Sequence, residues 1–227
     1  EQYDEALALA KEALALGKSS LGPQDESTLT AMFHLAGVYA ARRQHSLALT
    51  LLNELLGLTS AVHGSDSLAL VPVLHAIAEV SDDVGQLDTA MLNLQQALDI
   101  RAAALGTDDI SYGHSCSNLG HALARLACED GEQSSDGRLK CAMRAVELVG
   151  EAVRVAQASA DAETAIGFVL DVHSIFERSC SSVCSAGWSR EPVRVLQRLH
   201  LELTGKELPP SIQRDCGIPE EADASGD

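Results

Sequence analysis

The sequence repeats itself with a period of 42 residues, and this repeat limits the fold more than any other feature of the chain. Small residues within apolar runs, and a glycine after each run, recur at this spacing: Ala6, Ala48 and Ala90, and Gly22, Gly64 and Gly106. Within each run the apolar residues recur at steps of three and four, which is the pattern of a helix with one buried face. Periods of about 20 to 50 residues are typical of helical units that stack on one another.

Each 42-residue unit is predicted to contain two helices. An apolar residue recurs at the matching position of the first helix: Leu35, Ile77 and Leu119. The glycine after the second helix suits a left-handed helix C-cap. The stretches that follow it, at 24–27, 65–67 and 107–109, are rich in Asp and Ser, which are preferred helix N-caps. The predicted unit is therefore a helix, a short turn, a second helix and a capped loop.

Five residues of one unit match a known repeat family: Leu35, Ala36, Tyr39, Ala48 and Leu52. At these residues the sequence resembles the tetratricopeptide repeat, and its 42-residue period is similar to that of the kinesin light chain subtype. The resemblance is strong over residues 3 to about 127 and weak over 138–178. It implies an all-α fold, namely a right-handed superhelical solenoid of antiparallel helix pairs with about three to four repeats and divergent C-terminal capping helices.

The repeat register breaks after Leu126. Ala145 and the residues after it reproduce the spacing of a second helix, but they come 13 residues later than the period predicts, and the polar stretch 129–137 is the obvious insertion. We therefore predict four regions: a repeat array at 1–127, an inserted polar loop at 128–138, a divergent repeat with capping helices at 139–205, and an acidic tail at 206–227. Because residues 3–16 have the character of a second helix, we also expect at least one helix of the array upstream of Glu1.

The charge and composition of the chain exclude some partners. Sixteen Lys and Arg residues against 33 Asp and Glu residues give a formal net charge of −17, which repels nucleic acid and anionic lipid. No apolar run approaches the ~20 residues needed to span a bilayer, so we expect no nucleic acid partner and no membrane insertion. The six cysteines form no CxxC pair, and we expect an intracellular, reducing compartment, either the cytoplasm or an organelle matrix.

The densest group of metal-ligating residue types is His114, Cys116, His121 and Cys128. Three of them, at 114, 121 and 128, lie at steps of seven residues, about 10.5 Å apart along a helix, which is too far for neighbouring ligands of one zinc ion. The sequence also lacks a phosphate-binding loop and the common hydrolase, protease and kinase motifs. We therefore predict no metal, no cofactor, no catalytic residue and no enzymatic activity.

The resemblance further implies that the first helix of each pair lines a concave groove. Counting from the apolar positions places eight polar residues on this face as candidates for binding a partner: His34, His75, Glu79, Asp83, His114, Asn118, His121 and Arg125. Kinesin light chain grooves carry mainly Asn, Lys and Arg and bind acidic peptides that contain Trp. Asn118 and Arg125 keep this character, whereas Glu79 and Asp83 do not, so the same ligand class does not follow. The alternative is that these residues form an ordinary solvated surface.

These observations favour a non-catalytic scaffold for protein–protein interactions. We expect a structural or assembly subunit of a larger complex, which uses the groove and the helix faces to bind a peptide segment or other subunits of a multiprotein assembly. One alternative is a cargo- or peptide-binding adaptor of the kinesin light chain type. A more remote alternative is a helical-repeat metal regulator or enzyme.

Overall fold

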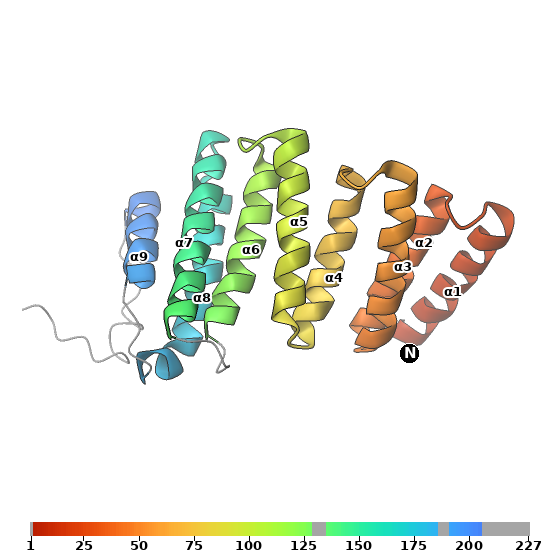
Figure 1. The fold of residues 1–227 in the computed structure, drawn as a ribbon, viewed down its shortest axis with the longest axis horizontal. Coiled ribbons are helices and arrows are strands. Elements are labelled where there is room, and N and C mark those ends of the chain that lie inside the picture. Colours follow the sequence, from red (N-terminus) through yellow and green to blue (C-terminus); the bar gives the residue numbers. More distant parts are fainter. Residues whose placement is uncertain (1, 129–134, 186–190, 206–227) are drawn as a thin grey trace, which may run out of the picture. The chain divides into compact units, whose positions relative to one another are not determined.

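The computed structural model describes residues 2–128, 135–185 and 191–205 (Figure 1). These residues form helices and connecting turns without any strand, so the prediction of an all-α fold is confirmed. The helices, in chain order, are α1 (Gln2–Ser20), α2 (Glu26–Ala41), α3 (His45–His63), the short 3-10 helix η1 (Leu68–Leu70), α4 (Val71–Asp83), α5 (Leu87–Leu105), α6 (Ile110–Cys128), α7 (Ser135–Ala158), α8 (Ala162–Ser185) and α9 (Glu191–Thr204).

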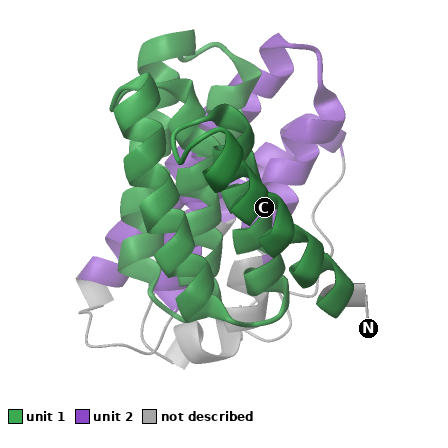
Figure 2. Ribbon diagram, turned by 90° about the vertical axis from the view of Figure 1, so that its right-hand side faces the viewer, with its two compact units in different colours: residues 1–115 green, residues 116–227 purple. Residues whose placement is uncertain are grey.

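The chain divides into two compact units, Glu1–Ser115 and Cys116–Asp227 (Figure 2). In the first unit, α1 packs against α2, α2 against α3, α3 against α4, and α4 against α5, as expected for stacked helical pairs. In the second unit, α7 packs against α8 and α9. The order of first and second helices within the first unit is the one that the 42-residue period predicts.

The core of the first unit is built from the aligned apolar positions. Leu35 and Ile77 are both buried, and they belong to one cluster that also contains Leu14 of α1, Leu52 of α3 and other apolar residues of α2 to α4. Leu119, at the matching position of α6 in the second unit, is buried as well. Burial of these apolar side chains is the main force that holds such helices together. The positions predicted to form the core are therefore confirmed.

The loops that lead from a second helix to the next first helix contain the repeated glycines. Gly64 follows α3 with φ 92° and ψ 160°, and Gly106 follows α5 with φ 84° and ψ 170°. This extended backbone with positive φ is essentially restricted to glycine. The sequence suggested the left-handed helical conformation instead. The requirement for glycine is confirmed, but the conformation that imposes it differs from the prediction.

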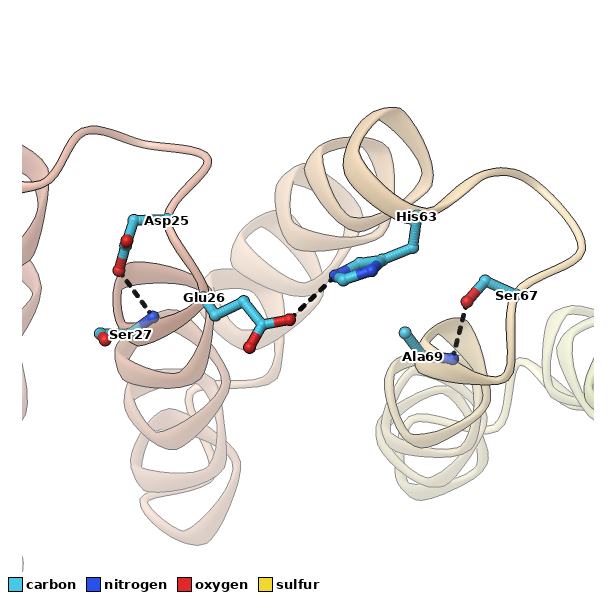
Figure 3. A network of polar contacts seen from close by, with 6 residues as sticks. All are labelled: Asp25, Glu26, Ser27, His63, Ser67 and Ala69. Carbon is cyan, nitrogen blue, oxygen red and sulfur yellow. Dashed lines mark hydrogen bonds and ion pairs between the residues drawn. The ribbon is translucent and has the colours of Figure 1, made fainter.

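Side chains in these loops cap the helices that follow. Three predicted N-caps each accept a hydrogen bond from the backbone N–H two residues further on: Asp25 (2.9 Å), Ser67 (3.2 Å) and Asp109 (2.7 Å). Figure 3 shows the first two, together with a polar contact in which Nε2 of His63 lies 3.7 Å from Oε1 of Glu26. This pair joins the end of α3 to the start of α2.

The short turns within a helix pair use the left-handed region of the backbone. Arg43 lies at φ 59° between α2 and α3, and Gly85 lies at φ 76° between α4 and α5, at the matching repeat position. In each turn the N–H of this residue, and that of the glutamine after it, donates to a carbonyl near the end of the preceding helix. The two turns therefore have the same hydrogen bonds although one has arginine where the other has glycine.

In the second unit, α6 and α7 approach each other closely at Gly120. A Cβ atom at this glycine would lie 3.1 Å from the carbonyl oxygen of Ala145 and 3.3 Å from Cγ2 of Val149. Gly120 has the repeat position of Ala36 and Ala78, where small residues were expected to let the helices of a pair approach. This contact supports the assignment of α7 as the second helix that pairs with α6.

Part of the segment that we predicted as an inserted loop is helical. We predicted a loop at 128–138, but α6 includes Cys128 and α7 begins at Ser135. Residues 129–134 lie outside the described residues. The polar composition of the segment hid the start of α7, because the first turn of a helix is often polar. The acidic tail at 206–227 also lies outside the described residues, and the capping role of 139–205 stays a prediction.

Candidate functional site

The candidate binding residues lie on the first helices, beside buried core positions. His34, Glu79, Asp83, His114 and Asn118 have exposed side chains, as predicted. The remaining three are half-buried: His75, His121 and Arg125. The residues on α4 lie at steps of four, and those on α6 lie at steps of four, three and four, so each helix presents its set along one side. A single groove that joins the two sets stays a prediction.

His75 differs from the solvated side chain that we expected. Its Nε2 atom is buried and makes no hydrogen bond within the described residues. Burial, and secondly the nearby charge of Arg101, lower the pKa of His75 to about 4, so the ring is neutral at pH 7. The repeat gives the reason, because the matching residues are Phe33, which is half-buried, and Ser117, which is buried. Side chains at this repeat position are partly buried between helices. The phenylalanine at the matching position 33 indicated this burial in the sequence.

Sequence reasoning missed Arg101, which links α5 to the start of α6. Its Nη1 atom donates hydrogen bonds to the backbone carbonyl of Ser111 and to Oγ of Ser115, both at 2.8 Å. Partial burial lowers the pKa of Arg101, and the carboxylate of Asp109 opposes that effect. The pKa of Asp109 is itself lowered, first by the hydrogen bond from the backbone N–H of Ser111. The sequence did contain a signal for this role, because the residues at the matching repeat positions, Gly17 and Thr59, are uncharged and Arg101 departs from them.

The charges of the first unit are unevenly paired. Several cations have partners within the unit: Lys18 lies 3.2 Å from Glu54, Arg42 pairs with Asp4, and Lys11 lies over the ring of Tyr39 at 5.9 Å. Glu79 and Asp83, by contrast, are exposed and form no ion pair with any residue that the structure describes. The exposed side of α4 therefore presents two unneutralised carboxylates one helical turn apart.

The residues considered as metal ligands in the sequence include Cys116, which makes a hydrogen bond to a carboxylate. Cys116 is buried, and its thiol donates to Oε2 of Glu151 at an Sγ–Oε2 distance of 3.8 Å. Among the described residues, no three or more His, Cys, Asp or Glu side chains are grouped so that they could hold a metal ion. The structure thus offers no assembled ligand set in this part of the chain. The described helices also include none with the length and apolar character needed to cross a membrane.

Comparison with known proteins identifies the repeats. The family model of the tetratricopeptide repeat matches residues 1–59 and 33–103. No curated protein matches the chain in sequence. The matched residues include the first two aligned core positions, Leu35 and Ile77, whereas Gly106 and Leu119 lie beyond them.

Solved structures support the same fold. The chain is similar to the nearly identical TPR-like repeats of a protein from Podosopora anserina described as a kinesin light chain, with a TM-score of 0.64, 19% identity and coverage of 90% of each chain. A variant of that protein with one substitution gives the same values. At this identity the likeness concerns the fold. Residues 1–103 therefore match the tetratricopeptide repeat, and the chain shares the fold of the TPR-like repeats of that protein.

Proposed function

We propose that this protein is a non-catalytic scaffold that serves as a structural or assembly subunit of a larger complex. Tetratricopeptide repeats are in general a fold for protein–protein interaction, because stacked helix pairs create extended surfaces without a large additional core. The partner-binding surface proposed in the first unit is the exposed side of the first helices, centred on Glu79 and Asp83 of α4. We call this surface the α4 face.

The unpaired carboxylates carry this proposal. Glu79 and Asp83 are exposed, lie four residues apart on one helix and repel each other, which costs a few tenths of a kcal/mol. The core beneath them is formed by other residues, including Ile77. Such a pair slightly destabilises the fold, whereas it would contribute electrostatic attraction to a partner of opposite charge.

The test uses a tagged form of this chain to purify its complex from the native source. The purified complex is then analysed by crosslinking mass spectrometry. We expect a stable set of partners whose crosslinks cluster on the first helices. The double change Glu79→Lys and Asp83→Lys should release the partners. The control is Asp99→Lys, which changes an exposed carboxylate on α5 of the same repeat and should leave the partners bound. Retention of every partner by the double variant would contradict the proposal.

A second candidate is a peptide-binding adaptor of the kinesin light chain type. Asn118 and Arg125 on α6 favour it, since they keep the polar and basic character of such grooves. The distinguishing measurement is fluorescence anisotropy with an acidic, tryptophan-containing peptide. Micromolar binding that Arg125→Glu removes would support the adaptor, and the absence of binding would leave the scaffold as the better account.

A further inference from the structure

The α4 face continues onto α2, where the matching positions carry almost no side chain. The repeat places Gly37 at the position of Glu79, and Ala41 at the position of Asp83. Helices α2 and α4 are in contact, and all four of these residues are exposed. A Cβ atom at Gly37 would meet nothing within 4 Å. The two carboxylates of α4 therefore lie beside open space on the neighbouring helix.

The packing of the helices does not require a glycine at position 37. At Gly120 a Cβ atom would lie 3.1 Å from a backbone oxygen, whereas Gly37 has room for a side chain. Glycine in the middle of a helix is also less favourable than alanine. The missing side chain of Gly37 thus adds nothing to the packing of the fold, but it leaves room for a group of a partner.

Two rings lie one helical turn before Gly37 on α2. Phe33 is half-buried, His34 is exposed, and their ring centroids are 6.3 Å apart in an edge-to-face arrangement. Positions 33 and 37 are four residues apart, so they share one side of the helix. Aromatic faces attract cations, and arginine is found on them more often than lysine. We define the α2–α4 strip as Phe33, His34, Gly37 and Ala41 of α2 together with Glu79 and Asp83 of α4.

The first unit has few cations of its own to neutralise the strip. Residues 1–115 contain 15 Asp and Glu but only five Lys and Arg. Three of these cations contact an acidic or aromatic side chain elsewhere, and Arg101 donates to two serines of α6. Glu79 and Asp83 form no ion pair within the part of the chain that the structure describes. Charge complementarity therefore favours a basic partner.

The spacing of the two carboxylates suits an extended segment. The four-residue step from Glu79 to Asp83 covers about 6 Å along the helix axis. In an extended chain, alternate side chains point to the same side and are about 6.6 to 7 Å apart. Two arginines at alternate positions would therefore each meet one carboxylate. The planar guanidinium can donate two hydrogen bonds to a carboxylate in a fixed geometry, which the ammonium group of lysine does not match.

We propose that the α2–α4 strip binds an extended segment of a partner protein that carries arginines at alternate positions. One guanidinium occupies the space above Gly37, where it pairs with Glu79 and lies near the ring of Phe33. The next lies above Ala41 and pairs with Asp83. This inference rests on the proposed function, because it names the kind of partner that the α4 face binds.

The probe for the experiment is a fluorescein-labelled peptide in which three arginines alternate with serines. It is titrated with the 227-residue chain at low salt, and binding is followed by anisotropy. The double change Glu79→Gln and Asp83→Asn should weaken binding by at least about tenfold, because both charge-assisted pairs are lost. The matched control is Asp88→Asn with Asp99→Asn, which removes two exposed carboxylates of α5 and should leave binding nearly unchanged.

A second pair of variants tests the open space on α2. Gly37→Leu fills this space and should weaken binding several-fold. Gly57→Leu is the control, because Gly57 is an exposed glycine within α3 whose surroundings are equally open, and it should not affect binding.

The spacing and type of the basic residues are tested on the peptide. A peptide with the arginines at every third position should bind several-fold more weakly, because neighbouring arginines then point to opposite sides of an extended chain. A peptide with lysines at the alternate positions has the same charge and should also bind more weakly than the arginine peptide. Equal binding of all three peptides would overturn the proposal.

Two further results would overturn it. One is the absence of binding to the parent chain. The other is equal binding by the double carboxylate variant and its control, since the peptide would then respond only to the net charge of −17. Circular dichroism checks that each variant stays helical.

The proposed function is tested separately, by the release of native partners from the Glu79→Lys and Asp83→Lys variant. Partners that are released although the arginine peptide does not bind would support the α4 face and exclude this ligand. Peptide binding with retention of every native partner would support the ligand of the strip and contradict the proposed function.

Discussion

The turn residues Arg43 and Gly85 show how one backbone conformation is filled by two different side chains. Both have positive φ and make the same hydrogen bonds to the preceding helix. A residue with a Cβ atom is disfavoured in the left-handed region, by about 1 to 2 kcal/mol, because Cβ crowds the following carbonyl oxygen. The turn at Arg43 is therefore strained relative to its counterpart at Gly85.

Exchanging the two residues tests this difference. Arg43→Gly should raise the free energy of unfolding by about 0.5 to 1 kcal/mol, since the relief of strain exceeds the added freedom of the unfolded chain. Gly85→Arg should lower it by about 1 kcal/mol. Urea denaturation of the two variants and the parent chain measures both values. Changes of the same sign at the two sites would show that something other than backbone strain decides the choice of residue.

His75 should make the fold sensitive to acid. Its pKa is about 4 in the folded chain and 6.5 in the unfolded chain, so on acidification the unfolded state binds a proton before the folded state does. The contribution of neutral His75 is complete above about pH 6.5 and declines as the pH falls toward 4. His75→Phe, which installs the residue of the matching position 33, should reduce the loss of stability between pH 7 and pH 4.5.

We expect this reduction to be about 1 to 2 kcal/mol, less than the full pKa shift would give, because the ring is partly exposed. Urea denaturation of the parent chain and the variant at both pH values measures it. Acidic and other residues titrate equally in both proteins, so the difference isolates His75. An equal loss of stability in the two proteins would contradict the assignment.

The sequence predicted those side chains whose role depends on neighbours along the chain. The caps at Asp25, Ser67 and Asp109 follow from residue type and position alone, and all three are present. The burial of His75 and the hydrogen bonds of Arg101 depend on which helices lie beside them, and a single sequence carries that information only indirectly. In both cases the clue was a mismatch with the other repeats.

Among the helices, the α6–α7 contact depends on a missing side chain. Gly120 faces the backbone of α7 at Ala145, so Gly120→Ala would force the helices apart and should destabilise the chain by about 1 kcal/mol. Gly150 is the matched control, since it also lies within a helix but a Cβ atom there would meet nothing within 4 Å. Gly150→Ala should stabilise the chain by about 0.5 to 1 kcal/mol. Thermal unfolding compares them, and a gain at both sites would show that the contact tolerates a methyl group.

Helix positions were predictable where the repeat is regular. The 42-residue period gave the order and core of α2 to α5, because each helix repeats the apolar spacing of its counterpart. The insertion before α7 removed that guide. The spacing of the apolar residues in α7 still identified Ala145 as part of a second helix. The start of α7 at Ser135, however, lies in a polar stretch where no apolar period marks the helix.

Stability along the chain should follow the local packing of its helices. Helices of the first unit pack mainly against their neighbours in sequence, so a defect is felt by adjoining helices first. Leu35→Ala removes buried side-chain volume from the first unit and should cost about 2 to 5 kcal/mol there. Hydrogen exchange should then speed up in α1 to α3 and stay unchanged in α8. A uniform increase across all helices would mean that the chain unfolds as one cooperative body.

The same sequential packing has a mechanical consequence. Within the first unit, the contacts join helices that are adjacent or nearly adjacent in the chain. A pulling force applied to the ends of this unit would therefore load one helix–helix contact after another, in contrast to a sheet whose strands are sheared together. We expect extension in small steps at low force and rapid recovery on release, because re-forming each contact requires the closure of only a short loop. The first unit should therefore respond to force as a compliant spring.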